Sequence, residues 1–440
     1  MSLESQLATL ITALGTDYKA LNGYRPPMYR AGRMVPGTVL TTFQASHGWT
    51  TAGTAGTNDL NDTTSFISGS QSAWIMSNGA GAQYDLRKFS SAIGDTTGKA
   101  FRLRIKVDDL TKLDELVFYA GKGSLSTDDY KWSYIVGSGS RYLVDGEWAN
   151  IVLSFANATV EGAPTRSDCT DLQFQVFDTN TGTGAKLHAQ SVELIPGGHA
   201  DFPNGVVSVC FDDTWLSPKT LAYNKMDSLG FPATMFIIQD YLGSSGLYLT
   251  LQDLRDRADR FGWEIACHAS TGANHASSQT GLTAAALDTD LRAQRAVLEA
   301  YGFRGASGYA MPLGQFGKTS DNASTMDITR KYMSYARTTH SRTTEVLPPA
   351  DPYRLRAVSA IGSFAGAVAA SVLTTATTGK IDMAKAEGAW LILVFHKIVT
   401  TTPADSGECL QSDFNAIMDK IASAGMPVMT IEDVLKTTSS

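Results

Sequence analysis

The sequence predicts a multidomain fold: an N-terminal helix, then an antiparallel β-sandwich, then a (β/α) barrel. Three observations lead to this prediction. The chain has 440 residues, which is more than one ordinary domain holds. Short runs that alternate apolar and polar residues recur up to residue 196, whereas apolar strands alternate with helical patterns after residue 205. A turn-rich stretch, 196–205, separates the two patterns. We therefore expect domains at 1–27, 28–198 and 199–440.

Leucines near heptad spacing predict a helix over residues 3–21, with Ser2 as its N-cap. Gly23 and the pair Pro26-Pro27 end this pattern. So short an amphipathic helix is unstable in isolation, and it therefore needs a surface to pack on. Two interpretations are equally open. The helix docks on its own domain, or it trimerises the chain or docks on another protein.

Between Thr38 and Pro196 the chain is rich in Gly, Ser, Thr and Asn and carries period-two runs with turn residues between them. This pattern is typical of the strands of an antiparallel β-sandwich. The runs lie at residues 101–107, 115–119, 148–155, 172–177 and 187–194.

The late runs resemble those of the jelly-roll carbohydrate-binding modules. They give a strand begun by Trp148, a loop with Asp, a further strand, and a terminal strand with Val192-Glu193-Leu194. The resemblance implies a jelly-roll-like sandwich that binds carbohydrate. Four aromatic residues are candidates for stacking on sugar rings, although such side chains more often belong to a core: Trp49, Trp74, Trp132 and Tyr134.

Beyond residue 205, strands and helices alternate, which predicts a parallel sheet closed into a barrel. Pro218 lies in the first turn of one helix and Gly230 stops it. Strands are predicted at 206–213, 233–238, 263–268, 309–311, 334–338, 391–396 and 428–431, and helices at 218–229, 250–261 and 283–301. In such a barrel the chemistry gathers at the carboxyl ends of the strands.

Composition excludes several classes of function. The formal net charge is -7 without a block of Lys and Arg, which argues against a nucleic-acid partner. The four cysteines lack paired spacing, so neither a disulfide framework nor a zinc knuckle is expected. No apolar run reaches transmembrane length, and residues 1–5 do not resemble a signal peptide. We expect a protein made in the cytoplasm and not inserted in a membrane.

Carboxylates and imidazoles follow the predicted strands. Asp212-Asp213 ends the first strand, His268 and His396 end two later ones, and His275 follows in a loop. One carboxylate with two imidazoles is a common open metal site, and such a metal suits amide or ester hydrolysis. Taken singly, each residue has a structural explanation, since Asp213 or Thr214 could cap the next helix and strand-end histidines are often structural. Taken jointly, they predict a metal-dependent hydrolase.

At these residues the chain resembles the polysaccharide deacetylase family, the NodB-homology esterases of carbohydrate esterase family 4. The resemblance covers residues 206–436. Cys210-Phe211-Asp212-Asp213 resembles the family motif Thr-Phe-Asp-Asp. Gly262-Trp263-Glu264-Ile265 with His268 resembles the second motif, and Leu393-Val394-Phe395-His396 matches the Leu-x-x-His motif. The resemblance implies a distorted (β/α) barrel of NodB type.

By this resemblance Asp212 would be the catalytic base, and Asp213 and His268 would be ligands of one divalent metal, with zinc the default. His396 would be the general acid that protonates the leaving amine. The substrate implied is an acetylated polysaccharide, which loses an N- or O-acetyl group.

The chain departs from the family pattern at two positions. The second ligating histidine lies four residues after the first in the family, and here that position is Gly272, so His275 is the candidate ligand. The motif Arg-x-Pro-x-Gly resembles Ala310-Met311-Pro312-Leu313-Gly314, with Ala in place of Arg. Arg337 is the candidate substitute, and Leu313 could still donate its backbone N–H to the oxyanion. The acidic residue of the fourth motif has no counterpart that we can identify.

The whole assembly resembles minor tail or fibre proteins of bacteriophages, which join a short N-terminal helix to an enzyme acting on the host surface. This resemblance implies a virion-associated protein whose partners are an acetylated polysaccharide and, through residues 1–27, other tail proteins. Two alternatives stay open. One is a receptor-binding tail protein with a degenerate, non-catalytic deacetylase domain, and the other is an intracellular amidohydrolase acting on a small amide.

Overall fold

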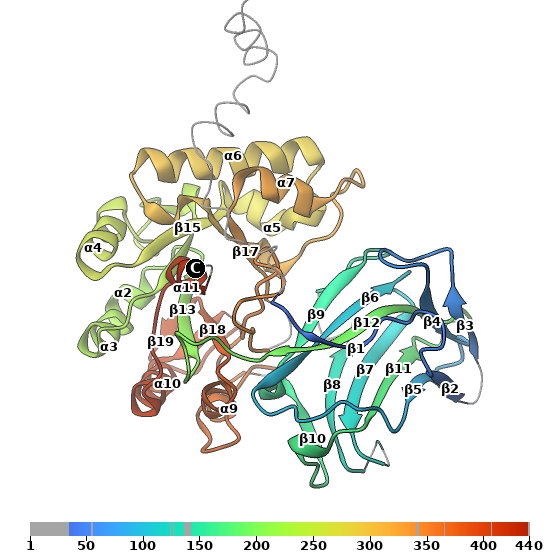
Figure 1. Cartoon of the computed structure of the whole chain (residues 1–440). Helices are drawn as coiled ribbons and strands as arrows, with labels where there is room; N and C mark the ends of the chain where they lie inside the picture. Colours follow the sequence, from blue (N-terminus) through green and yellow to red (C-terminus); the bar gives the residue numbers. More distant parts are fainter. Residues whose placement is uncertain are drawn as a thin grey trace, which may run out of the picture.

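The computed structural model describes residues 35–53, 56–123, 125, 127–135, 142–339, 343–364, 366–405 and 407–438. The predicted helix over residues 3–21, with the expected domain 1–27, lies outside these ranges. Figure 1 shows a pair of stacked sheets, coloured blue to green, beside a sheet surrounded by helices, coloured green to red. No helix within the ranges above is long and apolar enough to cross a membrane.

The first unit is the predicted antiparallel sandwich. One sheet has the strand order β3-β4-β12-β6-β9, with β1 also paired to β12, and the other has the order β10-β8-β7-β11-β5-β2. The strands are β1 Thr38–Thr41, β2 Thr50–Gly53, β3 Gly56–Asp62, β4 Ser72–Ser77, β5 Gln83–Lys88, β6 Lys99–Val107, β7 Leu113–Gly121, β8 Asp129–Ile135, β9 Ala149–Leu153, β10 Thr159–Glu161, β11 Asp171–Asp178 and β12 Lys186–Pro196.

Aromatic side chains fill the space between these two sheets. Phe118 packs against Phe101, Trp132 and Phe174 at ring centroid distances of 5.3, 6.0 and 5.0 Å. Three of the four aromatic residues considered for sugar stacking are core residues: Trp49, Trp132 and Tyr134 are at most 9% exposed. Trp74 is half-buried, and Lys186 Nζ lies 4.0 Å from its ring centroid. A sugar-binding surface on this unit therefore cannot use the first three.

The second unit holds a six-stranded parallel sheet with the order β17-β16-β15-β14-β13-β18. Its strands are β13 Val206–Asp212, β14 Thr234–Ile238, β15 Glu264–Ala269, β16 Gly308–Ala310, β17 Tyr335–Arg337 and β18 Trp390–Phe395, and a separate pair is formed by β19 Lys397–Val399 and β20 Glu408–Leu410. The helices are α2 Ser217–Leu221, α3 Tyr223–Leu229, α4 Leu251–Phe261, α5 Gly272–Gly281, α6 Ala284–Ala300, α7 Thr325–Tyr332, α8 Ala370–Thr374, α9 Lys380–Ala386, α10 Gln411–Ala424 and α11 Ile431–Thr438. Short 3-10 turns are η2 Phe155–Asn157 and η3 Arg166–Asp168 in the first unit, and η4 Gln239–Tyr241, η5 Arg304–Ser307 and η6 Pro312–Gly314 in the second.

The segment with Leu355 and Val358, which lies between β17 and β18 in the sequence, pairs with both edge strands of the parallel sheet. Leu355 forms a parallel bridge with Arg337 at the end of β17, and Val358 forms one with Leu393 in β18. Side chains then alternate between two cores. Val206, Cys210, Trp390, Ile392 and Val394 pack together on one side of the strands with residues of α11, whereas Val207, Val209, Leu391 and Leu393 pack against the outer helices. This alternation decides which strand-end side chains face one another.

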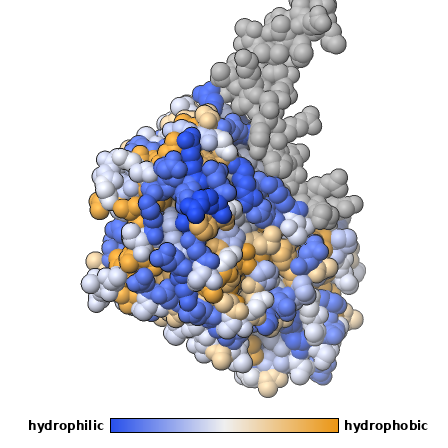
Figure 2. All heavy atoms as spheres, turned by 90° about the vertical axis from the view of Figure 1, so that its left-hand side faces the viewer, coloured by the Kyte–Doolittle hydropathy of each residue, from blue (hydrophilic) through white to orange (hydrophobic). Residues whose placement is uncertain are grey.

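Figure 2 shows the side on which α2, α3 and α4 lie, and hydrophilic residues cover much of its coloured surface with hydrophobic residues between them. These helices match the predicted ones closely. Thr250 caps α4 through Asp253, and Gly230 ends α3 with a left-handed φ of 67°. The predicted helix 218–229 is divided into α2 and α3 at Ala222.

One predicted strand is absent, and one structural explanation of the carboxylate pair does not hold. Residues 428–431 form a single bridge, Val207 with Val428, and not a strand. Thr430 and Asp433 bond to each other in the manner of a capping box, so α11 begins at Ile431. Asp213 and Thr214 do not cap α2, because its N-cap is Leu216 and the Thr214 hydroxyl donates to Ile238 O.

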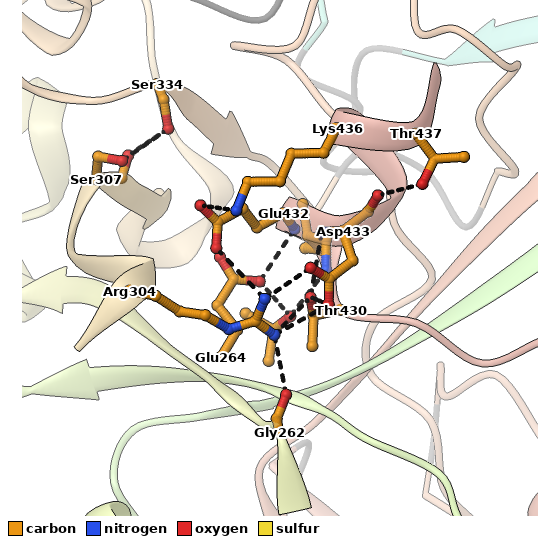
Figure 3. Close-up of polar contacts among 12 residues, drawn as sticks. Gly262, Glu264, Arg304, Ser307, Ser334, Thr430, Glu432, Asp433, Lys436 and Thr437 are labelled. Carbon is orange, nitrogen blue, oxygen red and sulfur yellow. Dashed lines mark hydrogen bonds and ion pairs between the residues drawn. The ribbon is translucent and has the colours of Figure 1, made fainter. Parts of the chain in front are cut away.

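A polar cluster holds α11 against the start of β15 (Figure 3). Arg304 pairs with Asp433, at 2.6 Å from Nη1 to Oδ1, and donates to Gly262 O at 2.9 Å. Within this cluster Glu264 is fully buried and accepts hydrogen bonds from Tyr335 Oη, Thr234 Oγ1 and Glu432 N. Burial and the nearby Glu432 carboxylate raise the pKa of Glu264 from 4.5 to about 7.

The raised pKa of Glu264 predicts a pH-dependent stability. The folded chain favours the protonated carboxyl, so its contribution is largest below pH 4.5 and is lost as the pH rises through about 7. We expect Glu264→Gln to leave the stability unchanged near pH 5 and to raise it by ~2 kcal/mol near pH 8. Denaturant titrations of both proteins at the two pH values measure this. Equal stability of the two proteins at the higher pH would contradict the expectation.

Candidate active site with a metal centre

The first strand of the parallel sheet ends in the two carboxylates. Asp212 is the last residue of β13, and its side chain, 3% exposed, lies on the same side of the strand as Cys210. Asp213 and Thr214 have left-handed φ angles of 70° and 64°, so the chain turns sharply at this point. Thr214 Oγ1 accepts from Ile238 N at 2.9 Å and donates to Ile238 O at 3.1 Å, which holds the turn. The two neighbouring carboxylates therefore occupy different positions.

Two imidazoles face Asp213. His268 Nε2 and His275 Nε2 lie 3.4 and 3.3 Å from Asp213 Oδ1, and 3.1 Å from each other. The other ring nitrogen of His268, Nδ1, lies 2.8 Å from Ala310 O and donates to it, so Nε2 is left to face Asp213 and His275. His275 was expected in a loop. It lies instead in the first turn of α5, where Thr271 is the N-cap.

The donor set fits a divalent cation. Each of three side chains offers one ligand atom, and these three atoms lie within 4.8 Å of one another: Asp213, His268 and His275. Asp213 Oδ1 is buried and has no hydrogen-bond partner within the described ranges. A buried carboxylate oxygen without a donor, facing two imidazole nitrogens, is an arrangement that a cation such as Zn²⁺ satisfies.

The electrostatics favour positive charge between these three side chains. Burial alone would raise the pKa of Asp213, but the neighbouring imidazoles, above all that of His268, hold it well below its usual range. Burial opposes the charged form of His268, yet Asp213 and Asp212 together raise its pKa. Burial and the charge of His268 lower the pKa of His275 to about 4, so its nitrogen keeps a lone pair at neutral pH.

Gly272 occupies the position where the family pattern has a histidine. A Cβ on Gly272 would lie 2.2 Å from Tyr241 Oη, and the Tyr241 ring stacks on Tyr248 at 4.5 Å. Any side chain at 272 must therefore displace Tyr241. The helical turn of α5 instead brings His275 to the cluster.

Arg337 is paired with Asp212. Its Nη2 donates to Asp212 Oδ2 at 2.5 Å, and the guanidinium is fully buried over the ring of Phe236. The register of the sheet places Arg337 of β17 directly beside Ala310 of β16. The guanidinium that contacts Asp212 thus comes from the strand adjacent to position 310.

His396 and Leu313 lie at the same end of the sheet. His396 follows β18, and its Nε2 is 4.0 Å from Asp212 Oδ2 and from Asp213 Oδ2, with a quarter of the side chain exposed. Leu313 lies in η6, three residues beyond the carbonyl that accepts from His268, with a left-handed φ of 56° and an exposed side chain.

An aromatic surface beside the carboxylates was not predicted. Trp215, Tyr241 and Tyr248 are half-buried, and Tyr248 lies 4.9 Å from the Trp215 ring and 4.5 Å from the Tyr241 ring. Lys397 Nζ lies 4.4 Å from the Trp215 ring on the side of β19. The sequence signal was the position of Trp215, two residues after the carboxylate pair.

Residues 199–330 match the family model described as polysaccharide deacetylase. No curated protein sequence matches the chain. Among solved structures, a family 4 carbohydrate esterase from Streptomyces lividans in complex with acetate is similar at 18% identity and a TM-score of 0.33, over 53% of this chain and 96% of that one. A family 4 acetyl xylan esterase from Clostridium thermocellum in complex with a cobalt ion is similar at 14% identity and a TM-score of 0.33, over 53% of this chain and 91% of that one. A family 11 carbohydrate-binding module of a cellulosomal cellulase of Clostridium thermocellum is similar at 14% identity and a TM-score of 0.29, over 38% of this chain and 99% of that one.

Proposed function

We propose that residues 199–440 form a metal-dependent polysaccharide deacetylase, with a distorted (β/α) barrel of NodB type, that removes N- or O-acetyl groups. One observation carries the proposal. The cluster of Asp213, His268 and His275 lies within 4.0 Å of a second carboxylate, Asp212, that is paired with a buried arginine. The match of residues 199–330 to the deacetylase family model supports the same reaction class.

Asp213, His268 and His275 would hold one divalent metal, with zinc as the ion that best suits this donor set. When bound, the metal would polarise the acetyl carbonyl and acidify a water molecule. Asp212, within 4.0 Å of His268, would accept the proton of that water. Arg337 would orient Asp212 through the contact between Nη2 and Oδ2.

His396 would donate a proton to the departing amine or hydroxyl, since it lies at the open side of the two carboxylates. The backbone N–H of Leu313 would donate to the oxyanion, a role that needs no particular side chain. The products would be acetate and a free amino or hydroxyl group on the sugar.

The aromatic surface of Trp215, Tyr241 and Tyr248 supports a carbohydrate substrate. The faces of such rings stack on the C–H faces of sugars. Trp215 follows Asp213 by two residues, and Tyr248 joins the Trp215 ring to the Tyr241 ring. The net charge of -7 also favours a neutral or cationic polymer over a polyanion.

The sandwich would bind the same polymer through the outer face of the β7, β8, β11 and β5 sheet. Arg87, Gln173, Tyr119 and Lys131 are paired in register across four adjacent strands of this face. In the next row Gln175 accepts from Tyr119 Oη at 3.0 Å and donates to Asp85 at 3.1 Å. A row of planar polar groups beside an aromatic ring is suited to sugar hydroxyls.

Gln173 is the residue of this face that we expect to bond to the glycan. It is 4% exposed and has no hydrogen-bond partner for its side chain among the residues described. Gln173→Ala should weaken glycan binding about 5- to 10-fold, the effect of one lost hydrogen bond of ordinary strength. Affinity electrophoresis on acetylated polysaccharides measures it. The exposed Gln252→Ala on α4 is the matched control, and equal affinity of both variants would contradict this part of the proposal.

We further propose that the protein is a virion-associated tail component acting on the surface polysaccharide of a host cell, with residues 1–27 joining it to other tail proteins or to further copies of the chain. This part is supported by the resemblance of the domain order alone. Immunogold labelling of virions tests it, and labelling confined to the host cytoplasm would contradict it.

The rival function is glycan binding without catalysis. The buried pairing of Arg337 with Asp212 favours catalysis, because it restores the contact that the substitution at position 310 would remove. The test is acetate release from acetylated glycans by the full chain, before and after treatment with a chelator. We expect release that chelation abolishes. Binding of the glycan without any acetate release would favour the rival.

A further inference from the structure

The segment that joins β17 to β18 holds the strands on which two of the proposed catalytic residues lie. We call residues 343–358 the strap. Leu355 N donates to Ala336 O at 3.0 Å and Thr338 N donates to Leu355 O at 2.9 Å, so the strap brackets the backbone of Arg337. Val358 N donates to Ile392 O and Val394 N donates to Val358 O, two residues before His396. The strap therefore sets the positions of both strand ends.

The side chains on either side of Leu355 reach the sandwich. Arg354 Nη1 donates to Tyr142 O at 3.1 Å, and its Nη2 pairs with Glu147. Arg356 Nη1 donates to Val152 O of β9 at 2.8 Å. Successive residues of an extended chain point to opposite sides, so Leu355 packs in the sheet core while the two arginines turn to the sandwich.

The beginning of the strap is hydrogen-bonded to the side chain of Asn157 in the sandwich, and Val346 packs against Ala100, Val152 and Ile195. Asn157 Oδ1 accepts from Thr344 N at 2.8 Å and from Thr344 Oγ1 at 3.0 Å, and Asn157 Nδ2 donates to Thr344 O at 3.0 Å. Buried partners complete the strap, since Arg356 Nη2 donates to Glu345 Oε1 at 2.6 Å with both side chains at most 6% exposed. The strap thus bonds to sandwich atoms through Thr344, Arg354 and Arg356, and Arg356 in turn holds Glu345.

We infer that the sandwich is part of the catalytic unit, and that Asn157 is a positioning residue that acts through the strap on Arg337 and, through Arg337, on Asp212. This inference rests on the proposed function for its effect on catalysis. A sandwich that only tethered the enzyme to a polymer would need no buried arginines at its contact with the strap. Removal of the contacts at Thr344 would loosen the strap, and the orientation of Arg337 toward Asp212 would become less defined.

The test compares Asn157→Ala, Asn157→Asp and Asn58→Ala in the full chain. Asn157→Asp keeps the acceptor for Thr344 N and Oγ1 and loses the donor, whereas Asn58→Ala removes one hydrogen bond to Tyr84 elsewhere in the sandwich. Amide hydrogen exchange at Thr338 and Leu355 is the first readout. We expect it to be about 10-fold faster in Asn157→Ala, intermediate in Asn157→Asp and unchanged in Asn58→Ala.

The second readout is hydrolysis of para-nitrophenyl acetate, a substrate too small to use the outer face of the sandwich. We expect kcat to fall about 10-fold in Asn157→Ala with KM within about twofold, because orientation is lost and not binding. Unchanged exchange at Thr338 and Leu355, or an unchanged kcat in an active protein, would overturn the inference. A wild type without esterase activity would refute the proposed function, and the exchange rates would still decide whether the sandwich holds the strap.

Discussion

Asp212→Asn should reduce acetate release by between about 10²- and 10⁴-fold, the range that a positioned general base contributes. The carboxamide has nearly the shape of the carboxylate and can still accept from Arg337 Nη2, which lies 2.5 Å from Asp212 Oδ2. It cannot take a proton from water, so catalysis is lost while the fold is kept. The measurement is kcat for acetate release, with the melting temperature and metal content of the same sample.

The matched control for this prediction is Asp259→Asn, which removes one carboxylate from the exposed side of α4. We expect this variant to retain full activity. If Asp212→Asn released acetate as fast as Asp259→Asn, another group would have to be the base. Loss of metal from Asp212→Asn would show instead that Asp212 is a metal ligand, which would contradict its proposed role as the general base.

His275→Ala should weaken metal binding by at least about 100-fold and abolish acetate release at stoichiometric metal. The imidazole is one of three donors, and its Nε2 lies 3.3 Å from Asp213 Oδ1 and 3.1 Å from His268 Nε2. Two remaining donors do not form a closed set for a structural or catalytic zinc ion. Isothermal titration of the metal-free protein with Zn²⁺ measures the affinity.

His199→Ala is the control for His275→Ala, since the polar and ring interactions of the His199 side chain with the described residues are those with Asp201 and Phe202 in the linker after β12. We expect wild-type metal affinity in this variant. Full metal occupancy in His275→Ala would remove His275 from the ligand set. Activity would then have to depend on Asp213 and His268 with a ligand that no motif indicated.

The strand ends could be predicted from the sequence because their periodicity is strong. Asp212, His268 and His396 each follow a short apolar run, and in a parallel sheet the carboxyl ends of such runs meet at one edge. Alternation along each strand also turns Asp212 and Arg337 toward each other. The structure brings these residues and Asp213 together, and their chemical roles stay predictions.

The surroundings of the site could not be predicted in the same way. Helix α5 has little apolar periodicity, since it is built of Gly, Ala, Asn, Ser and Thr around His275, so the histidine was expected in a loop. The strap gave no strand signal either, because Pro348, Pro349 and Pro352 interrupt its pattern. Its role depends on contacts such as Asn157 with Thr344, which are 187 residues apart in the chain.

The roles of the aromatic residues of the sandwich could not be predicted from the sequence either. Trp49, Trp132 and Tyr134 could serve a core or a sugar platform, and only the packing between the two sheets assigns them to the core. The outer face with Gln173 and Tyr119 gave no sequence signal, because polar residues at alternate strand positions predict a solvated face, whereas these two side chains are buried.

Titration of the metal-free full chain with Zn²⁺, with acetate release from an N-acetylated glycan measured at each step, tests the central claim most directly. We expect no release without metal and a rate that rises linearly to a plateau at about one equivalent of metal per chain, the capacity of a single Asp/His₂ site. Acetate release that does not depend on metal, or glycan binding with no acetate release at any metal concentration, would contradict it.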